Sequence, residues 1–403
     1  MFNAGFLIFT LGSALCGFSP SIYHLIAFRC IQALGGSLMQ ANSGAIIADT
    51  FPRNRRGRAF GYNSLGFTSG SMLGIVLGGV ITSFVGWEYI FFINIPIGVV
   101  AILLGVRYLR DNVKVEAKLD LPGAVLLGIS LFPLSFGAIN LATEGVTGLD
   151  IACMAAGAAL FALFIFNERK AMSPMLDFTV FTKKILRYSI LAAFFQSLGY
   201  LAVVFLITMY LQGVRGLSPL DAALLLIPGY VVGSFLGPVM GRLSDKYGAR
   251  LLASSGVVVI GIAIAIYLTL GMSTPLYFVM IASAIAGTGT SMFFPANNSE
   301  IMAHAQASSF GSVSGLLRTV QNIGMLGSFV LAISVAAATI PRQVAFEIFV
   351  GTTNLTGGIA QDFIYGIDSA LYISLVLLAI AFILSLSRGK AARSEQPTEV
   401  VSK

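Results

Sequence analysis

Charged residues are scarce in this chain of 403 residues: only 10% are Asp, Glu, Lys or Arg, against 57% hydrophobic residues. A soluble domain carries about 25% charged residues, so the shortage excludes a water-soluble globular protein. Cysteine is also rare, and Cys16, Cys30 and Cys153 all fall inside apolar segments. This placement indicates small buried hydrophobic residues rather than a disulfide or metal set.

The chain also lacks the residue patterns that enzymes use. No nucleophile stands beside a base, no cluster has metal-ligand spacing, and no phosphate-binding loop follows a strand pattern. The only histidines, His24 and His304, lie near the ends of apolar segments and form no metal constellation. We therefore predict a protein that is not an enzyme and needs neither a cofactor nor a metal ion.

Long apolar runs dominate what is present. A helix needs about 20 apolar residues to cross a bilayer, and hydrocarbon admits only segments whose backbone is satisfied internally. The runs far exceed strand length, so we predict an all-α polytopic membrane protein with about 12 transmembrane helices. The predicted spans are 2–18, 22–47, 59–84, 89–109, 121–141, 149–167, 187–212, 219–241, 249–271, 275–296, 309–340 and 367–387.

Basic residues occupy alternate gaps between these spans. Of the 24 Lys and Arg residues, only Arg29, Arg215, Arg318 and Arg342 lie elsewhere. Positive residues mark the cytoplasmic side, so we predict a multi-pass plasma-membrane protein with both chain ends in the cytoplasm. Charges placed in short loops also explain the net charge of +7 without a nucleic-acid partner. The polar segment 389–403 is predicted to be a disordered cytoplasmic tail.

Two cations, Arg29 and Arg318, are predicted to lie inside spans, where a charge at the bilayer centre costs at least about 2.5 kcal/mol. Each requires a carboxylate, a water-filled cavity or a substrate nearby, although Arg29 is close enough to the outer edge to reach it. Every Asp and Glu falls in a loop, in the tail or near a predicted span end. The sequence therefore predicts no carboxylate at the midplane.

Uncharged polar side chains within the spans mark a candidate substrate cavity. Each of them has an alternative interpretation as an interhelical hydrogen bond, which is the more frequent role. The candidates are Gln40, Asn42, Tyr62, Asn63, Gln196, Tyr200, Gln321 and Asn322.

Glycines recur every four residues at Gly66, Gly70, Gly74 and Gly78. A step of four residues advances about 400° around a helix, so these glycines share one slowly drifting face. Absent side chains let a neighbouring helix approach closely. The stripe indicates either static packing or a contact that slides as two helices rock, and the sequence leaves both interpretations open.

The segment Gly241–Arg250 places one carboxylate among several cations. We predict a tight cytoplasmic turn in which Asp245 lies against the positive N-terminal end of a helix, worth about 0.3–1 kcal/mol when exposed and up to about 2 kcal/mol when partly buried. A contact of that size can bias a conformational equilibrium and still be broken in each cycle. The alternative is an ordinary solvated basic loop.

Several of these segments resemble motifs of the major facilitator superfamily, specifically its fourteen-span drug–proton antiporter branch. Arg29–Gly36 is similar to the fourth-helix motif R-x-x-Q-G-x-G, with Ala33 in place of the first glycine. Gly70–Gly79 resembles the fifth-helix antiporter motif G-x-x-x-G-P-x-x-G-G, with Ile75 in place of the proline. Trp87–Gly98 is similar to W-R-x-x-F-x-I-N-x-P-x-G, with Glu88 in place of the arginine.

The resemblance extends into the second half of the chain. The gating motif G-x-x-x-D-x-x-G-x-R is matched by Gly241, Asp245, Gly248 and Arg250. A faint internal repeat supports two similar halves, because Phe60-Gly61 with Gly74 is echoed by Phe310-Gly311 with Gly324.

The resemblance implies two pseudo-symmetric bundles. Residues 1–118 are expected to form a partial N-terminal bundle of four helices, 119–168 an inserted helix pair, and 169–388 a C-terminal bundle of six helices. The first two helices of the family, which carry an acidic coupling residue, are expected to be missing, so the chain is interpreted as a fragment or as having a misassigned start.

Roles for individual residues follow from the resemblance and from the polar positions. Transport and coupling are assigned to Arg29, Gln32 and Arg318, helix sliding to the antiporter-motif glycines Gly70, Gly74, Gly78 and Gly79, and a cytoplasmic latch to the gating motif around Asp245.

The implied function is a monomeric secondary transporter that exports small amphipathic organic molecules against inward proton flow, by alternating access. Ile75 and the missing acid favour a rival, an importer or uniporter of a specific metabolite. A second rival is a truncated or sensor-like membrane protein that transports nothing.

Overall fold

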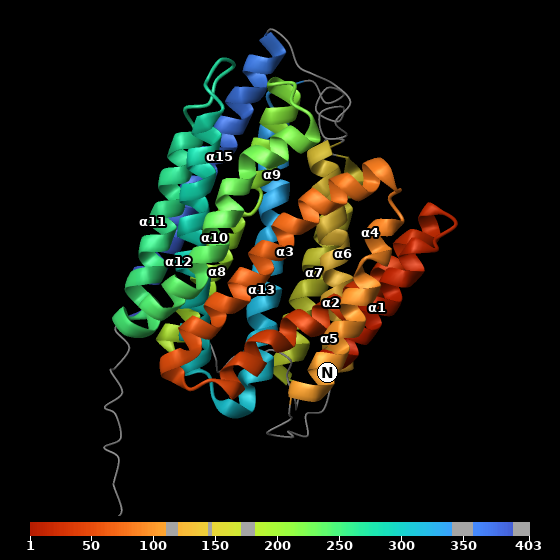
Figure 1. The fold of residues 1–403 in the computed structure, drawn as a ribbon, viewed down its shortest axis with the longest axis vertical. Coiled ribbons are helices and arrows are strands. Elements are labelled where there is room, and N and C mark those ends of the chain that lie inside the picture. Colours follow the sequence, from red (N-terminus) through yellow and green to blue (C-terminus); the bar gives the residue numbers. More distant parts are fainter. Residues whose placement is uncertain (110–119, 144–146, 171–181, 341–357, 390–403) are drawn as a thin grey trace, which may run out of the picture.

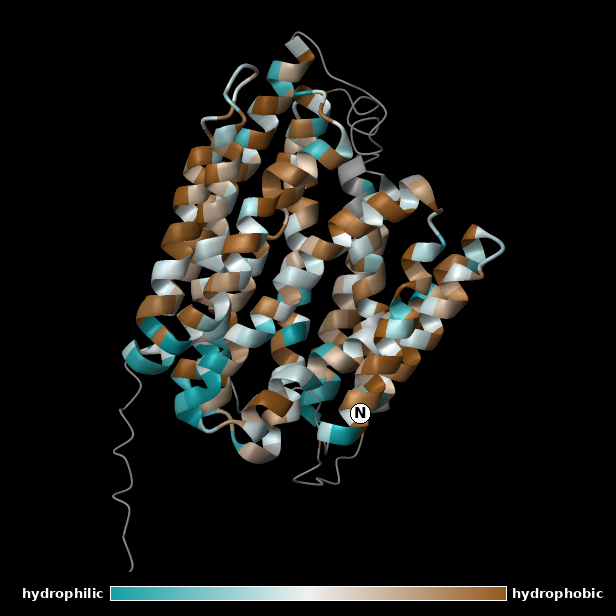
Figure 2. Cartoon of the chain, viewed as in Figure 1, coloured by the Kyte–Doolittle hydropathy of each residue, from teal (hydrophilic) through white to brown (hydrophobic). Residues whose placement is uncertain are grey.

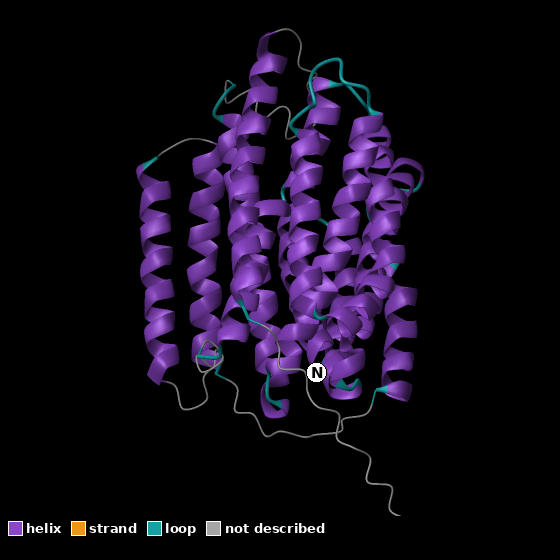
Figure 3. Cartoon of the chain, turned by 90° about the vertical axis from the view of Figure 1, so that its left-hand side faces the viewer, coloured by secondary structure: helices purple, strands orange, loops and turns teal. Residues whose placement is uncertain are grey.

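A computed structural model describes residues 1–109, 120–143, 147–170, 182–340 and 358–389. In these residues the regular elements are helices, without a strand among them (Figure 3). In chain order (Figure 1) they are α1 (Phe2–Gly17), α2 (Ile22–Thr50), η1 (Arg53–Arg55), α3 (Arg56–Phe84), α4 (Tyr89–Phe92), α5 (Asn94–Tyr108), α6 (Leu121–Thr143), α7 (Gly148–Lys170), α8 (Lys184–Tyr200), α9 (Val203–Met209), the π-helix η3 (Tyr210–Val214), α10 (Pro219–Tyr247), α11 (Ala249–Tyr267), α12 (Tyr277–His304), η4 (Ala307–Ser309), α13 (Phe310–Ala337) and α15 (Gly358–Ser387).

The length and the apolar composition of the helices fit a membrane protein. Ten stretches of the described chain are long and apolar enough to cross one, and two shorter apolar helices, Phe2–Gly17 and Pro122–Gly137, accompany them. Large apolar side chains cover the outer surface, among them Phe132 and Phe235, each 73% exposed. Lipid tails are as apolar as these side chains, so such a surface is stable in a bilayer and not in water. The predicted all-α membrane architecture is confirmed.

Hydrophilic residues gather near the lower end of the bundle in Figure 2, while hydrophobic residues cover the lengths of the helices. At this end α2, α10 and α12 finish and α3, α11 and α13 begin, with Arg53, Arg58, Arg242 and Lys246 close to those junctions. We call it the basic end. The first residue of α1 lies there too (Figure 1).

Two groups of helices meet at the basic end. The N-terminal half (residues 1–109) contains α1–α5, the C-terminal half (residues 182–389) contains α8–α15, and α6 and α7 pack on each other beside α13. The C-terminal half has its own extensive buried core. A smaller buried cluster joins the halves, because Ala48 and Phe60 pack against Leu186, Ile301 and Val313.

Glycines allow α3 and α10 to cross in close contact. A Cβ placed on Gly61 would lie 2.8 Å from the carbonyl carbon of Gly237, and one on Gly241 would lie 2.7 Å from the carbonyl carbon of Gly57. Such distances leave no room for a side chain, so backbone packs directly on backbone. The regular stripe at Gly66–Gly78 does not take part, since a Cβ on any of its glycines meets nothing within 4 Å.

Two helix boundaries differ from the sequence prediction. The tight turn predicted for Gly241–Arg250 is wrong, because α10 continues to Tyr247 and only Gly248, with φ +95°, separates it from α11. Charged residues end the apolar signal at the membrane surface, but they do not end the helix. Likewise α15 begins at Gly358, so Asp368 lies well inside this helix and not near its start.

A buried cation closes the C-terminal half at the basic end. Arg388, at 0% exposure, follows the last residue of α15. Its Nη1 donates to Asn297 Oδ1 at 3.0 Å and to Ser189 Oγ at 3.3 Å, and its Nη2 donates to the carbonyl oxygen of Ala249 at 2.7 Å. One guanidinium therefore holds the end of α15 against α12, α8 and α11.

Arg388 stays charged at neutral pH. Burial lowers its pKa, Glu300 opposes this shift and Arg250 adds to it, so that the pKa lies at about 10. Three hydrogen bonds offset part of the cost of burying the charge, while its Nε finds no hydrogen-bond partner among the described residues.

The glycine crossing gives a first prediction. Gly61→Ala should lower the free energy of unfolding by about 1–3 kcal/mol, because the added methyl group overpacks the α3–α10 contact. Gly74→Ala is the matched control on the same helix and should change it by less than about 0.5 kcal/mol. Thermal unfolding of the purified proteins in detergent measures both. Equal effects of the two substitutions would show that the crossing is not tightly packed.

Removal of the buried cation gives a second prediction. Arg388→Gln should destabilise the protein by about 3–5 kcal/mol, since it leaves buried polar partners without their donor. Arg187→Gln, which neutralises an exposed arginine of α8 at the same end, should cost under about 0.5 kcal/mol. Denaturation curves of both variants are the measurement, and a small loss for Arg388→Gln would contradict an anchoring role.

Candidate functional site

Asp245 joins the two halves at the basic end. Its half-buried carboxylate, near the end of α10, accepts hydrogen bonds from the backbone amides of Gly57 at 2.8 Å and Arg58 at 2.9 Å. These amides belong to the first turn of α3, where no carbonyl of the same helix is available and the helix dipole is positive. The structure thus places Asp245 at a helix N-terminus, and its gating role stays a prediction.

The other positions of the gating motif support this contact. Gly241 lies directly on Gly57, one turn of α10 before Asp245. Gly248 adopts a positive φ, which an L side chain rarely does, and so ends α10 and allows α11 to begin at Ala249. Arg250 is half-buried in the first turn of α11, and its positive charge is close enough to Arg388 to lower the pKa of that residue.

Arg56, in the N-terminal half, also makes a contact with the C-terminal half. Its side chain is only 7% exposed, and its Nη1 donates to the carbonyl oxygen of Met302 at 2.8 Å. Its Nη2 donates to Ala48 O at 2.5 Å and its Nε to Phe51 O at 3.0 Å. This role could not be predicted from the sequence, because Arg56 is one of four arginines in residues 53–58 and the positive-inside pattern explains each of them equally.

The two cations predicted inside spans have similar local partners. Arg29 Nη1 donates to Gln32 Oε1 at 3.0 Å, and its guanidinium lies 5.5 Å from the centre of the Phe91 ring. Arg318 Nη1 donates to Gln321 Oε1 at 3.3 Å. Both pairs have the spacing R-x-x-Q, one in α2 and one in α13. The repeated spacing was the signal in the sequence that would have linked Arg318 to Gln321.

The candidate cavity residues divide into two groups. Gln196, Tyr200 and Gln321 are buried within the C-terminal half, whereas Gln40, Tyr62 and Asn322 are exposed and Asn42 and Asn63 are half-buried. The structure therefore does not bring the whole set together.

Within this set the buried amides of Gln196 and Gln321 have polar atoms without a hydrogen-bond partner in the described part of the chain. Both amide atoms of Gln196 and the Nε2 of Gln321 find no hydrogen-bond partner among the described residues. Asn42, by contrast, donates to Leu38 O at 2.7 Å within its own helix, which is the ordinary packing alternative. Tyr200 lies close to Tyr230 and Tyr267. Gln196, Gln321 and Tyr200 thus remain the candidates for substrate contact in the C-terminal half.

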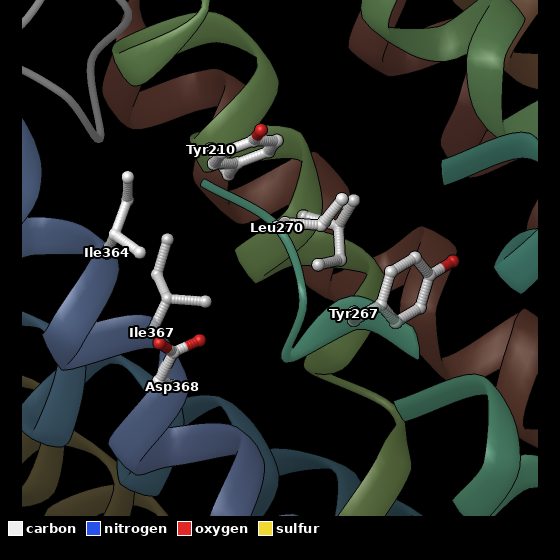
Figure 4. Close-up of a pocket in the computed structure, with 7 residues that line it drawn as sticks. Tyr210, Tyr267, Leu270, Ile364, Ile367 and Asp368 are labelled. Carbon is white, nitrogen blue, oxygen red and sulfur yellow. The ribbon is translucent and has the colours of Figure 1, made fainter. Parts of the chain in front are cut away.

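A small pocket lies away from the basic end, where η3, the end of α11 and α15 meet. Figure 4 draws its lining residues, among them Asp368 on α15, whose carboxylate lies beside Ile367, and Tyr267, whose hydroxyl points away from Asp368. The cavity measures about 10 Å³, which is room for a single water molecule. It is therefore too small to be the substrate site.

The antiporter-motif glycines Gly70, Gly74, Gly78 and Gly79 lie on α3, and a Cβ on any of them would meet nothing within 4 Å. Among the described residues, a side chain added at Gly70, Gly74 or Gly78 would therefore enter open space. Among all the residues that the structure describes, no group of three or more His, Cys, Asp or Glu residues is placed to hold a metal ion.

Comparison with known proteins identifies one family of membrane transporters. The sequence profile of the Major Facilitator Superfamily matches residues 1–328. The riboflavin transporter RibZ of Clostridioides difficile is 32% identical, over 80% of this chain and 70% of that protein. The multidrug resistance protein Stp of Mycobacterium tuberculosis is 28% identical, over 94% of this chain and 77% of that protein.

Two further comparisons extend this result. The tetracenomycin C resistance and export protein of Streptomyces glaucescens is 29% identical over 83% of this chain and 63% of that protein. The crystal structure of the human organic anion transporter MFSD10 shares the fold, with a TM-score of 0.58 over 94% of this chain and 76% of that one, at 16% identity. By its matched profile, its relatives and its helical architecture, the chain belongs to the Major Facilitator Superfamily of membrane transporters.

Proposed function

We propose that the chain is a secondary transporter that exports small amphipathic organic molecules by proton antiport, with the basic end in the cytoplasm of a plasma-membrane protein. Several relatives carry names of multidrug or antibiotic resistance proteins, which supports export of such molecules. The basic end fits a cytoplasmic face by the positive-inside rule. The protein acts as a monomer on a small-molecule substrate, and it is not an enzyme.

The observation that carries this proposal is the contact between the halves through Asp245 and the first turn of α3. Alternating access needs two halves that separate on one side of the membrane while they close on the other. A carboxylate against a helix end supplies about 2 kcal/mol at most, so it stabilises the state closed at the basic end without fixing it.

Coupling to protons is proposed to involve the Arg29–Gln32 pair. The guanidinium of Arg29 is exposed and donates a hydrogen bond to the amide oxygen of Gln32. A fixed cation favours the ionised form of any acid that approaches it. Arg29 therefore tunes proton release in the proposed cycle, while Arg318 holds the matching position in the C-terminal half.

A second candidate is transport of a specific flavin-like metabolite. One relative, 32% identical over 80% of this chain, is named a riboflavin transporter, and Ile75 replaces the proline of the antiporter motif. Reconstituted vesicles with an imposed pH gradient separate the two. Proton-driven movement of ethidium supports drug export, and downhill movement of riboflavin alone supports the second candidate. Failure to move either compound in both directions would contradict both proposals.

Neutralising the latch gives a third prediction. Asp245→Asn should reduce the turnover of substrate export about tenfold without raising KM, because loss of about 1–2 kcal/mol at the helix dipole depopulates the state closed at the basic end. The control is Asp221→Asn, which removes the same charge from the first turn of α10 at the opposite end. Initial rates in proteoliposomes measure both, and unchanged turnover in Asp245→Asn would refute the latch.

Removing the cation of α2 gives a fourth prediction. In Arg29→Ala vesicles, downhill substrate exchange should continue, but its stimulation by an imposed pH gradient should fall at least fivefold, or about 1 kcal/mol of coupling. Arg187→Ala, at an exposed position of α8, should leave the stimulation intact. Gradient-dependent efflux equal to that of the unmodified protein would exclude Arg29 from coupling.

A further inference from the structure

We propose that Arg56 is a positioning residue of the transport cycle, a second latch that closes the basic end independently of Asp245. The inference rests on the proposed function, because it concerns the same closed state. Nothing in the loop sequence separates Arg56 from Arg53, Arg55 and Arg58; the assignment comes from its contacts alone.

Arg56 binds helix C-termini of both halves. Ala48 O and Phe51 O belong to the end of α2 in the N-terminal half, while Met302 O belongs to the last turn of α12 in the C-terminal half. The last carbonyls of a helix lack intrahelical partners and carry the negative end of its dipole. One planar guanidinium with five N–H groups can satisfy several such carbonyls at fixed angles.

A ring contact adds to the attachment on the C-terminal half. The guanidinium lies 5.0 Å from the centre of the ring of Phe310, the first residue of α13. Arg56 therefore contacts both α12 and α13. Separation of the halves at the basic end would leave its charge without Met302 O and without this ring, in a side chain that is now only 7% exposed.

The Arg56 and Asp245 contacts have opposite polarity. Asp245 brings a negative charge from the C-terminal half to the positive start of α3, whereas Arg56 brings a positive charge from α3 to the negative ends of α2 and α12. They use different atoms and different partner helices, but both converge on residues 56–58. Opening of the basic end must break both, so each should shift the equilibrium by itself.

Neighbouring charges do not replace the carbonyl contacts. Arg53 and Asp49 are close enough to act electrostatically on Arg56, but their charges have opposite signs and their effects oppose each other. Among the described residues, the attachment across the boundary between the halves therefore comes from Met302 O and the Phe310 ring, not from an ion pair with a carboxylate of the C-terminal half.

Hydrogen–deuterium exchange of the full chain in nanodiscs tests this proposal. Arg56→Gln should speed exchange about tenfold in peptides covering 56–62 and 298–304, because the basic end opens more often. In the same sample, exchange at the opposite end, in peptides covering 17–24 and 214–221, should slow, because the population moves to the state closed there. A merely destabilised protein exchanges faster at both ends, and that result would overturn the proposal.

Matched variants sharpen the test. Arg56→Lys keeps the charge but not the fork of donors, so it should behave like Arg56→Gln; exchange equal to the unmodified protein would show that charge alone suffices and would refute the carbonyl bridge. Arg53→Gln, in the same loop, should have no effect. Arg56→Gln combined with Asp245→Asn should give the product of the two single effects, and no added effect would refute independence. The exchange pattern needs no substrate, so a failed transport assay would count against the proposed function and leave this test intact.

Discussion

A bilayer offers a backbone no hydrogen bonds, and this constraint governs which parts of the protein can form strong polar contacts. Along a helix each amide is already paired, so only helix ends carry free donors and acceptors. The strongest polar attachments at the basic end use these ends. Asp245 accepts from the free amides at the start of α3, and Arg56 donates to the free carbonyls at the ends of α2 and α12. Arg388, just after the end of α15, instead donates to two side chains and to Ala249 O.

The same constraint explains why two kinds of attachment coexist. Arg388 connects α15 to helices of its own half, so it can stay bound throughout a cycle. Asp245 and Arg56 connect different halves, so the proposed cycle requires both contacts to break. Reversal of a population from 1:99 to 99:1 takes about 5.5 kcal/mol. A single contact of about 2 kcal/mol is too weak for that, which favours several moderate contacts over one strong contact at such a boundary.

Hydropathy and charge placement predicted much of the fold, because both are sums over many residues. The helical spans and the basic end follow from such sums. Individual contacts do not. Periodicity showed that Gly66–Gly78 share a face, but the close crossing with α10 uses Gly57 and Gly61, since a period does not say which neighbour a face meets. The buried positions of Arg56 and Arg388 could not be predicted, because the positive-inside pattern does not distinguish a buried cation from an exposed one. The turn at Gly241–Arg250 was misplaced because polarity marks the membrane surface and not the end of a helix.

The two R-x-x-Q pairs show how a cation is tolerated inside a helix that moves. Arg29 and Gln32 belong to α2, and Arg318 and Gln321 belong to α13, so each pair keeps its hydrogen bond whichever way the halves tilt. A partner on another half would be lost whenever the halves separate, and the charge would then pay its full desolvation penalty in one of the two states. Partners three residues apart on one helix avoid that dependence. Pairing within one helix, as for Arg29 and Arg318, or within one half, as for Arg388, can therefore persist when the halves move, whereas the contacts of Asp245 and Arg56 between the halves cannot.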